Sequence, residues 1–145
     1  MSDTGIVIIG SAAGIIFFIW LGGIITRISG TWHDGKRTIV FKQWGPLVRG
    51  LCNIDGGQES YSGFAFFGRV RLERYATGKA YFLAAGFNEQ MIAFLKQEAL
   101  AGFKFKLRDN KLTGTFSGYK FSFGYQPTRI LRVTRMVGEP REWRR

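Results

Sequence analysis

The feature that most constrains this chain is an uncharged segment of 22 residues near its N-terminus, running from Gly5 to Thr26. Only Ser11 and Thr26 carry polar side chains in it. A helix of this length extends about 33 Å, which is enough to cross the roughly 30 Å hydrocarbon core of a bilayer. A helix that packs on a water-exposed domain has one apolar face, whereas this segment is apolar on every side. It therefore predicts a transmembrane helix over residues 5–26, preceded by a short extracytoplasmic N-terminus of residues 1–4.

A cleaved secretory signal peptide is the alternative interpretation of the same segment. Signal peptides begin with a basic region, followed by an apolar region of about 7 to 15 residues. Here the four residues before the segment include Asp3 and no basic residue, and the apolar run is longer than the template. We therefore expect a retained anchor.

The distribution of basic residues predicts the orientation of this anchor. No Lys or Arg precedes the segment, whereas Arg27, Lys36, Arg37 and Lys42 follow it closely. Positive residues beside a span favour the cytoplasmic side, and an inside-negative potential acts in the same direction. We expect a single-pass protein of the inner (plasma) membrane, with its N-terminus outside and its C-terminal domain in the cytoplasm. Trp32 follows the span at a distance that predicts a place among the lipid headgroups.

Small residues inside the segment suggest a contact between membrane helices. Gly10 and Gly14 form a GxxxG pair, and Gly22 and Gly23 add a second small patch. Such a face lets two helix backbones approach closely, either from two copies of this chain or from this chain and another membrane subunit. Glycine is also simply common in membrane helices, so both interpretations stay open.

The part of the chain after the segment is strongly basic. All 21 Lys and Arg residues lie there together with nine of the ten acids, which leaves a net charge of +12. An anionic lipid surface or an acidic partner protein would balance this charge. The residues expected to form the membrane or partner surface are Arg27, Trp32, Lys104, Lys106, Arg108 and Lys120.

Short alternating segments separated by turn residues predict a mainly antiparallel β domain over residues 27–137, either a barrel or a sandwich of about seven to nine strands. The expected strands cover residues 37–44, 47–53, 60–67, 69–75, 79–85, 103–108, 112–116, 119–125 and 128–137. The last of these also fits a helix, because three arginines recur in it at three-residue spacing. One α-helix is expected over residues 88–99, with Asn88 as its N-cap.

Residues 138–145 are polar and are expected to form a mobile C-terminal tail. Trp143, Arg144 and Arg145 would then be free to touch lipid headgroups.

No catalytic, cofactor or metal site is predicted. The chain has one Cys and one His, so an intrachain disulfide is impossible and a Cys and His zinc set cannot be assembled. Cys52 and His33 are the only conceivable nucleophile and base pair, and each is more simply explained as a small core residue and a turn residue. Phosphate-binding loops of the GxxxxGK[ST] type are absent. We expect a protein that is not an enzyme.

Phe103 to Lys106 alternate aromatic and basic side chains, a pattern that resembles a nucleic-acid-binding strand. Successive side chains of a strand point to opposite faces, so the rings cannot stack on bases from the surface that holds the cations. The aromatic residues are therefore predicted to be core, and nucleic acid is an unlikely partner.

Gly30, Thr31 and Trp32, placed before a run of up-and-down strands, resemble the G-x-W start of lipocalin-like barrels. The match covers three residues and carries no ligand pocket with it.

The function expected from these features is that of a non-enzymatic accessory or scaffold subunit of a membrane protein complex, whose basic cytoplasmic domain contacts anionic lipid or an acidic partner. Its partners would be membrane lipids and other membrane subunits or a second copy. A membrane-tethered small-molecule or lipid-binding β-barrel is the alternative, and a membrane-tethered nucleic-acid-binding domain is the second alternative. The identity of the complex and the oligomeric state do not follow from the sequence.

Overall fold

The structure is a computed structural model that describes residues 3–35, 37–54, 57–77, 82–83, 87–90, 92–93, 99–123 and 130–145. Within these ranges the side chains of residues 3–11, 76–77, 120–123 and 130–133 are not described.

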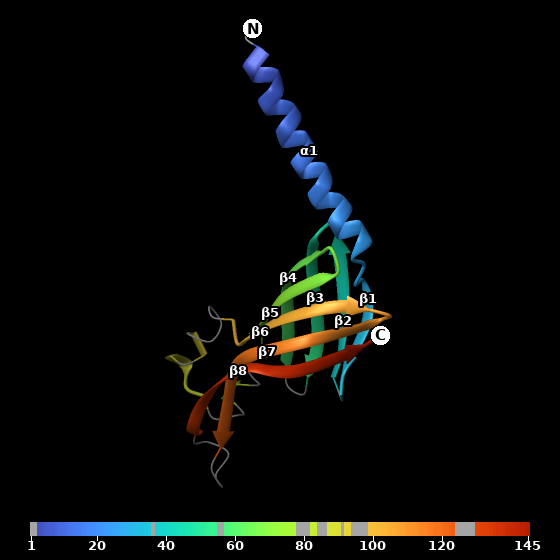
Figure 1. The fold of residues 1–145 in the computed structure, drawn as a ribbon. Helices are drawn as coiled ribbons and strands as arrows, with labels where there is room; N and C mark the ends of the chain where they lie inside the picture. The colour runs from blue at the N-terminus through green and yellow to red at the C-terminus, as the bar shows by residue number, and fades with distance from the viewer. Residues whose placement is uncertain are drawn as a thin grey trace.

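One helix is followed by eight antiparallel strands that close into a barrel in simple sequential order (Figure 1). The elements are α1 (Asp3–Ile25), β1 (Gly30–Asp34), β2 (Arg37–Trp44), β3 (Leu47–Ile54), β4 (Gly57–Phe66), β5 (Arg69–Thr77), β6 (Ala101–Arg108), β7 (Lys111–Phe123) and β8 (Ile130–Arg144). A pairing between His33 and Arg144 joins β1 to β8 and closes the ring. The prediction of an antiparallel β domain of seven to nine strands is confirmed. Of the two expected architectures, barrel and sandwich, the structure has the barrel.

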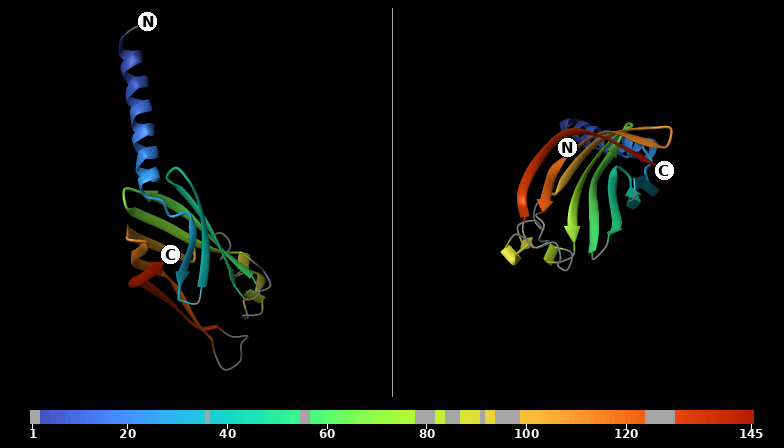
Figure 2. Two further views of the ribbon diagram at one scale, coloured as in Figure 1. Left: turned by 90° about the vertical axis from the view of Figure 1, so that its right-hand side faces the viewer. Right: turned by 90° about the horizontal axis from the view of Figure 1, so that it is seen from below.

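The helix projects away from one end of the barrel, and the strands curve around a common axis below it (Figure 2). Within the part of the chain whose side chains are described, which begins at Ala12 in α1, no helix is long and apolar enough to cross a membrane.

Tight turns at the helix side of the barrel explain where the strands end. Phe67 and Gly68 turn the chain between β4 and β5, and Asp109 and Asn110 turn it between β6 and β7. All four have positive φ angles, as two-residue hairpin turns with a right-handed strand twist require. The turn predicted at Asp109 and Asn110 is confirmed.

The barrel interior is filled mainly by aromatic side chains. Phe41, Tyr61, Phe103 and Phe105 surround the indole of Trp143, with ring centroids 4.7 to 6.1 Å from it. Alternation along each strand supplies these residues, because every second side chain points inward. The prediction that Phe103 and Phe105 belong to the core is confirmed.

The C-terminal part of the chain differs from the prediction. Residues 138–145 were expected to be a mobile tail, but β8 continues to Arg144, and Trp143 is completely buried. Arg145 is also held, because its backbone N–H donates to the carbonyl of Asn110 and its guanidinium donates to the carbonyl of Ser29. The polar side chains of this segment lie on the outer face of β8, the strand that closes the barrel by pairing with β1. The alternation of side chains along β8 places Trp143 inside the barrel.

Trp32 was expected at the membrane surface, and this prediction is wrong. Its side chain is fully buried, its Nε1–H donates to the carbonyl of Ile28 at 2.8 Å, and the guanidinium of Arg145 lies 5.3 Å from its ring. Because only four residues separate the end of α1 from the start of β1, Trp32 points into the barrel as part of the first strand.

Other boundaries also differ. Residues 117–118 were expected to turn, but β7 runs through them with an irregular register. The strands predicted at 112–116 and 119–125 are therefore one strand as far as Phe123, and residues 124–125 lie outside the described part. The strand predicted over 79–85 is wrong at Phe82 and Leu83, which are helical, and its other residues lie outside the described part.

The helix predicted over 88–99 is supported at residues 89–90 and 92–93, which are helical, and the N–H of Ile92 donates to the carbonyl of Asn88. At its predicted end the prediction is wrong, because Ala99 is not helical.

Candidate functional site

The joint between α1 and the barrel is organised by one side chain, that of Gln43 at the end of β2. Its Nε2 lies 2.8 to 2.9 Å from the carbonyl oxygens of Gly23, Thr26 and Gly45. Its Oε1 accepts a hydrogen bond of 2.8 Å from the N–H of Ile28. A helix leaves its last carbonyls without partners inside the helix, and Gln43 satisfies two groups of this kind from a strand. The end of α1 is therefore tied to the barrel.

Two glycines let the helix approach the barrel loops closely. A Cβ at Gly23 would lie 2.4 Å from the backbone of Gly45, and a Cβ at Gly22 would lie 2.5 Å from the ring of Phe66. Residues with larger side chains would push the helix away at these points. The small patch that the sequence suggested for contact with another membrane helix is thus used, at Gly22 and Gly23, to pack α1 on its own barrel.

Thr26 adds a further link, because its hydroxyl accepts a 2.6 Å hydrogen bond from the N–H of Gly68 in the β4–β5 turn. The carbonyl of Gly22 accepts another from Phe67. The joint therefore fixes the direction of α1 relative to the β2–β3 and β4–β5 turns.

Exposed apolar side chains surround this joint. We call them the apolar rim, and they are Trp44, Leu47, Phe64, Phe66 and Phe67. Trp44 is 67% exposed and meets the ring of Trp20 edge-on at 4.8 Å, while Phe67 lies 5.6 Å from Phe18. The rim is thus continuous with the exposed apolar surface of α1. An exposed apolar surface of this extent marks a contact with lipid or with protein.

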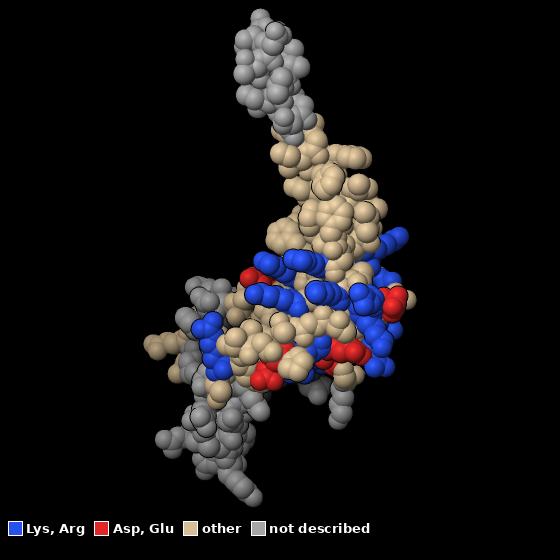
Figure 3. Space-filling view, viewed as in Figure 1, with Lys and Arg blue, Asp and Glu red and all other residues tan. Residues whose placement is uncertain are grey.

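A basic surface lies beside the apolar rim on the outside of β5 and β6. We call it the basic face, and it consists of Arg69, Arg71, Lys104 and Lys106, all of which are exposed. Lysine and arginine side chains gather below the end of α1 in the space-filling view (Figure 3).

The strand register sets these cations directly against one another. Arg69 is opposite Lys106, and Arg71 is opposite Lys104. Like charges at directly opposed positions of two strands destabilise a sheet. In the described part of the chain, no acidic side chain forms an ion pair with any of the four. The described part of the barrel therefore presents a concentrated positive charge that no described ion pair neutralises.

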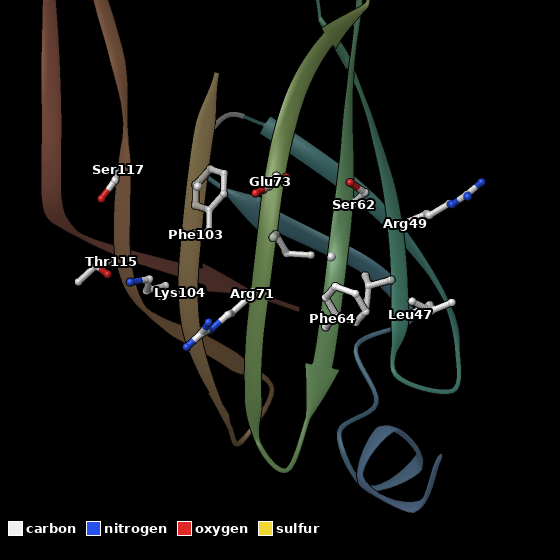
Figure 4. Close-up of a pocket in the computed structure, with 14 residues that line it drawn as sticks. Leu47, Arg49, Ser62, Phe64, Arg71, Glu73, Phe103, Lys104, Thr115 and Ser117 are labelled. Carbon is white, nitrogen blue, oxygen red and sulfur yellow. The ribbon is translucent and has the colours of Figure 1, made fainter. Parts of the chain in front are cut away.

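A groove of about 680 Å³ runs across the outer surface where the apolar rim meets the basic face (Figure 4). Its outward-pointing side chains are Leu47, Arg49, Ser62, Phe64, Arg71, Glu73, Lys104, Thr115 and Ser117. Leu47 and Phe64 form the apolar side of the groove, and Arg71 and Lys104 form its basic side (Figure 4).

A second polar cluster lies inside the barrel, at the end away from α1. The buried carboxylate of Glu59 accepts hydrogen bonds from Arg37 at 3.1 and 3.3 Å and from the hydroxyl of Tyr61 at 3.1 Å. Arg74 lies 3.8 Å from the same carboxylate. Burial, and then the Glu59 carboxylate, raise the pKa of the Tyr61 hydroxyl well above its usual range. Tyr61 therefore stays protonated and acts as a donor.

The structure does not bring together Cys52 and His33, the nucleophile and base pair considered from the sequence. Cys52 points into the barrel from β3 and is buried, whereas His33 is exposed on β1, where its Nδ1 lies 3.3 Å from the hydroxyl of Thr38. Burial, and secondarily the charge of Glu59, raise the pKa of the Cys52 thiol. A protonated thiol on the opposite side of the barrel wall from the imidazole is a poor nucleophile.

Of the surface residues predicted from the sequence, Arg27, Lys104, Lys106 and Arg108 are exposed. The backbone of Lys120 lies in β7, and its side chain is outside the described part. Of the predicted helix-packing pair, Gly14 has open space beside it, because a Cβ there would meet no heavy atom of the described residues within 4 Å. Gly10 lies in α1, within the stretch whose side chains are not described.

As site residues, sequence reasoning missed Gln43 and the two outward-facing arginines of β5, Arg69 and Arg71. Nothing in the local sequence marks Gln43, because its role depends on a helix end that lies 15 to 20 residues earlier in the chain. Arg69 and Arg71 could have been found, since their alternation with Val70 and Leu72 already places them on the outer face.

Among the described residues, no group of three or more His, Cys, Asp or Glu side chains is placed to hold a metal ion. No protein-family model, curated protein or solved structure matches this chain.

Proposed function

We propose that this protein is a single-pass membrane protein in which α1 anchors a basic β-barrel at the surface of an anionic leaflet. Its role is that of a non-enzymatic accessory or scaffold subunit of a membrane complex. The observation that carries the proposal is the joint, where Gln43 and the two glycines fix an apolar helix to a barrel end whose own apolar rim continues the helix surface. A soluble partner needs no such continuity, whereas a bilayer covers both surfaces at once.

The proposed orientation places the N-terminus outside and the barrel in the cytoplasm. One feature supports it, namely the basic face beside the C-terminal end of the helix. Cations of this number are held most favourably at the negatively charged cytoplasmic leaflet.

Cysteine labelling in intact cells tests the anchor and its orientation together. Cys52 is buried, so a membrane-impermeant maleimide should not label the folded native chain. We expect a Ser2→Cys variant to be labelled from outside, and an Arg135→Cys variant to be labelled only after the cells are opened. Both variants should stay in the membrane fraction after alkaline carbonate washing. Release by carbonate, or labelling of Arg135→Cys in intact cells, would contradict the proposal.

The proposed scaffold role places another membrane helix against the Gly10 and Gly14 face of α1. A Gly14→Leu variant should leave the barrel intact, because a Cβ at Gly14 would meet no described heavy atom within 4 Å. It should weaken recovery of protein partners, or of the homo-oligomer, in native mass spectrometry from mild detergent. Ala12→Leu is the matched control, because residue 12 lies on the opposite side of the helix. Equal recovery of partners with both variants would remove this face from the proposal.

A membrane-tethered barrel that binds a small anionic molecule is the second candidate. Two guanidinium groups, those of Arg37 and Arg74, share the single carboxylate of Glu59 inside the barrel, and the buried Nε of Arg74 has no hydrogen-bond partner. A buried donor without a partner is destabilising, and an anionic ligand would satisfy it. Native mass spectrometry separates the two candidates, because a ligand retained on a lone chain and lost in Arg74→Met favours this one.

A further inference from the structure

We propose that the groove between the apolar rim and the basic face is a binding site for an anionic phospholipid. This rests on the membrane tether proposed above. The headgroup phosphate lies between Arg71 and Lys104, and the acyl chains leave along Leu47 and Phe64 toward α1.

The strand register arranges the outer face in rows with a constant chemical order. One row crosses five strands as Leu47, Phe64, Arg71, Lys104 and Thr115, each directly opposite the next. It passes from apolar side chains through two cations to a hydroxyl. Such a sequence of groups matches a lipid, in which hydrocarbon, a negatively charged phosphate and a polar headgroup follow one another.

A second row repeats this order beside the first. Phe66 is opposite Arg69, Arg69 is opposite Lys106, and Lys106 is opposite Thr113. In this second row, as in the first, an apolar residue is followed by two cations and then by a hydroxyl. The two rows thus form one amphipathic surface, on which each arginine lies opposite an apolar residue and each lysine lies opposite a threonine.

The opposed cations supply the electrostatic reason for the site. Arg71 and Lys104 face each other across β5 and β6 and have no ion-pair partner among the described residues. A phosphate placed between them turns a repulsive pair into two charge-assisted contacts, and arginine can hold phosphate with two parallel hydrogen bonds. Glu73 also borders the groove, but its carboxylate accepts a 2.6 Å hydrogen bond from the hydroxyl of Tyr75.

The apolar side of the groove distinguishes a lipid from a soluble anion. Phe64 is 58% exposed and Leu47 is 44% exposed, and both belong to the rim that contacts α1 through Trp44 and Phe67. A nucleic acid or an inorganic phosphate would leave these side chains in water. A lipid in the same leaflet as α1 would cover them.

Native mass spectrometry of the full-length chain tests the site. The protein is released from micelles that contain equal amounts of phosphatidylglycerol and phosphatidylcholine, and the lipids that remain bound are counted. We expect preferential retention of phosphatidylglycerol. The preference should fall about fivefold for each cation removed in Arg71→Gln and Lys104→Gln, since one Lys or Arg near an anionic surface contributes about that factor. Arg135→Gln is the control for charge, because Arg135 is exposed and does not line the groove.

The apolar side has its own variant and control. Phe64→Ser should reduce the retention of phosphatidylglycerol, whereas Val137→Ser should not, although Val137 is also an exposed apolar residue. Equal retention of the two lipids by the native chain would overturn the proposal. So would unchanged retention in the Arg71→Gln, Lys104→Gln double variant, or binding of inorganic phosphate that phosphatidylglycerol cannot displace.

Carbonate washing distinguishes a failure of the proposed lipid site from a failure of the proposed membrane anchor. If the double variant stays in washed membranes and has lost its lipid preference, the site is supported and the tether is unaffected. If the native chain is itself released by carbonate, the tether fails. If the native chain stays but shows no lipid preference, the site alone fails.

Discussion

The two faces of β5 and β6 are built from the same backbone and serve opposite purposes. Inward, Val70, Leu72, Phe103 and Phe105 are buried and pack against other core side chains. Outward, the basic face places cations opposite cations. The inner face explains why the two strands stay paired, because buried apolar area is the main favourable term in folding. The outer face opposes that pairing, so the stability of the sheet does not explain its composition, whereas the proposed binding of an anionic lipid would.

The largest expected effect is on the inner face. Replacing Phe103 by Ala should lower the free energy of unfolding by about 3–5 kcal/mol, because it removes a large ring that contacts Tyr61, Phe105 and Trp143. Lys104→Ala, one residue further along β6, should change it by less than about 0.5 kcal/mol. Chemical denaturation of the two variants measures the difference, and similar losses in both would mean that the two faces are not distinct in this way.

Removal of the one buried acid in the described part of the barrel should have the next largest effect. Glu59→Gln leaves the guanidinium groups of Arg37 and Arg74 facing each other without the carboxylate that separates their charge. We expect a loss of about 1–3 kcal/mol in the free energy of unfolding, below the range for a fully buried pair because Arg37 is 40% exposed. Added salt should restore part of this loss. A neutral effect at low salt would show that water already screens the cluster.

Alkaline pH should reveal the same cluster through Tyr61. Burial and the Glu59 carboxylate raise the pKa of this hydroxyl above its ordinary value of 10, so the folded state keeps its proton where the unfolded state has lost it. The stabilising contribution is therefore complete below pH about 10 and is lost as the pH rises further. Stability measured from pH 9 upward should fall more steeply for the native chain than for Tyr61→Phe. Equal slopes would contradict the burial of this hydroxyl.

The smallest expected effect is a gain on the outer face. Removing one cation from each opposed pair, as in Arg71→Gln with Arg69→Gln, should stabilise the barrel by about 0.5–1 kcal/mol at low salt, because it relieves two like-charge contacts. The gain should shrink as salt is added. A loss of stability at low salt would show that these cations have stabilising partners.

Much of the barrel could be predicted from the sequence, because strand alternation and turns depend on residues that are close together in the chain. The alternation in β2 and β5 and the turn at Asp109 and Asn110 each depend on neighbouring residues, and their positions are confirmed. The predicted strand boundaries are wrong where contacts between residues far apart in the sequence determine the structure. Residues 138–145 look like a polar tail until β8 pairs with β7 and places Trp143 in the core.

The candidate site was predictable in part for the same reason. Lys104, Lys106 and Arg108 were assigned to the outer face from alternation alone, and all three are exposed. The pairing of Lys104 and Lys106 with β5 was not predictable, because the register of two strands separated by a long connection is set by tertiary packing. Trp32 was misassigned because its distance from the helix suggested a headgroup position, while the strand that begins at Gly30 places it inside.

Depth measurement at the apolar rim tests the central claim most directly. A spin label at Leu47→Cys is compared with one at Val137→Cys, both in a Cys52→Ala chain embedded in vesicles that contain phosphatidylglycerol. We expect the Leu47 label to be accessible to oxygen and shielded from a water-soluble nickel reagent, as at a bilayer interface, and the Val137 label to be exposed to the nickel reagent. Equal exposure of both labels to water would contradict the claim that lipid covers the rim beside α1.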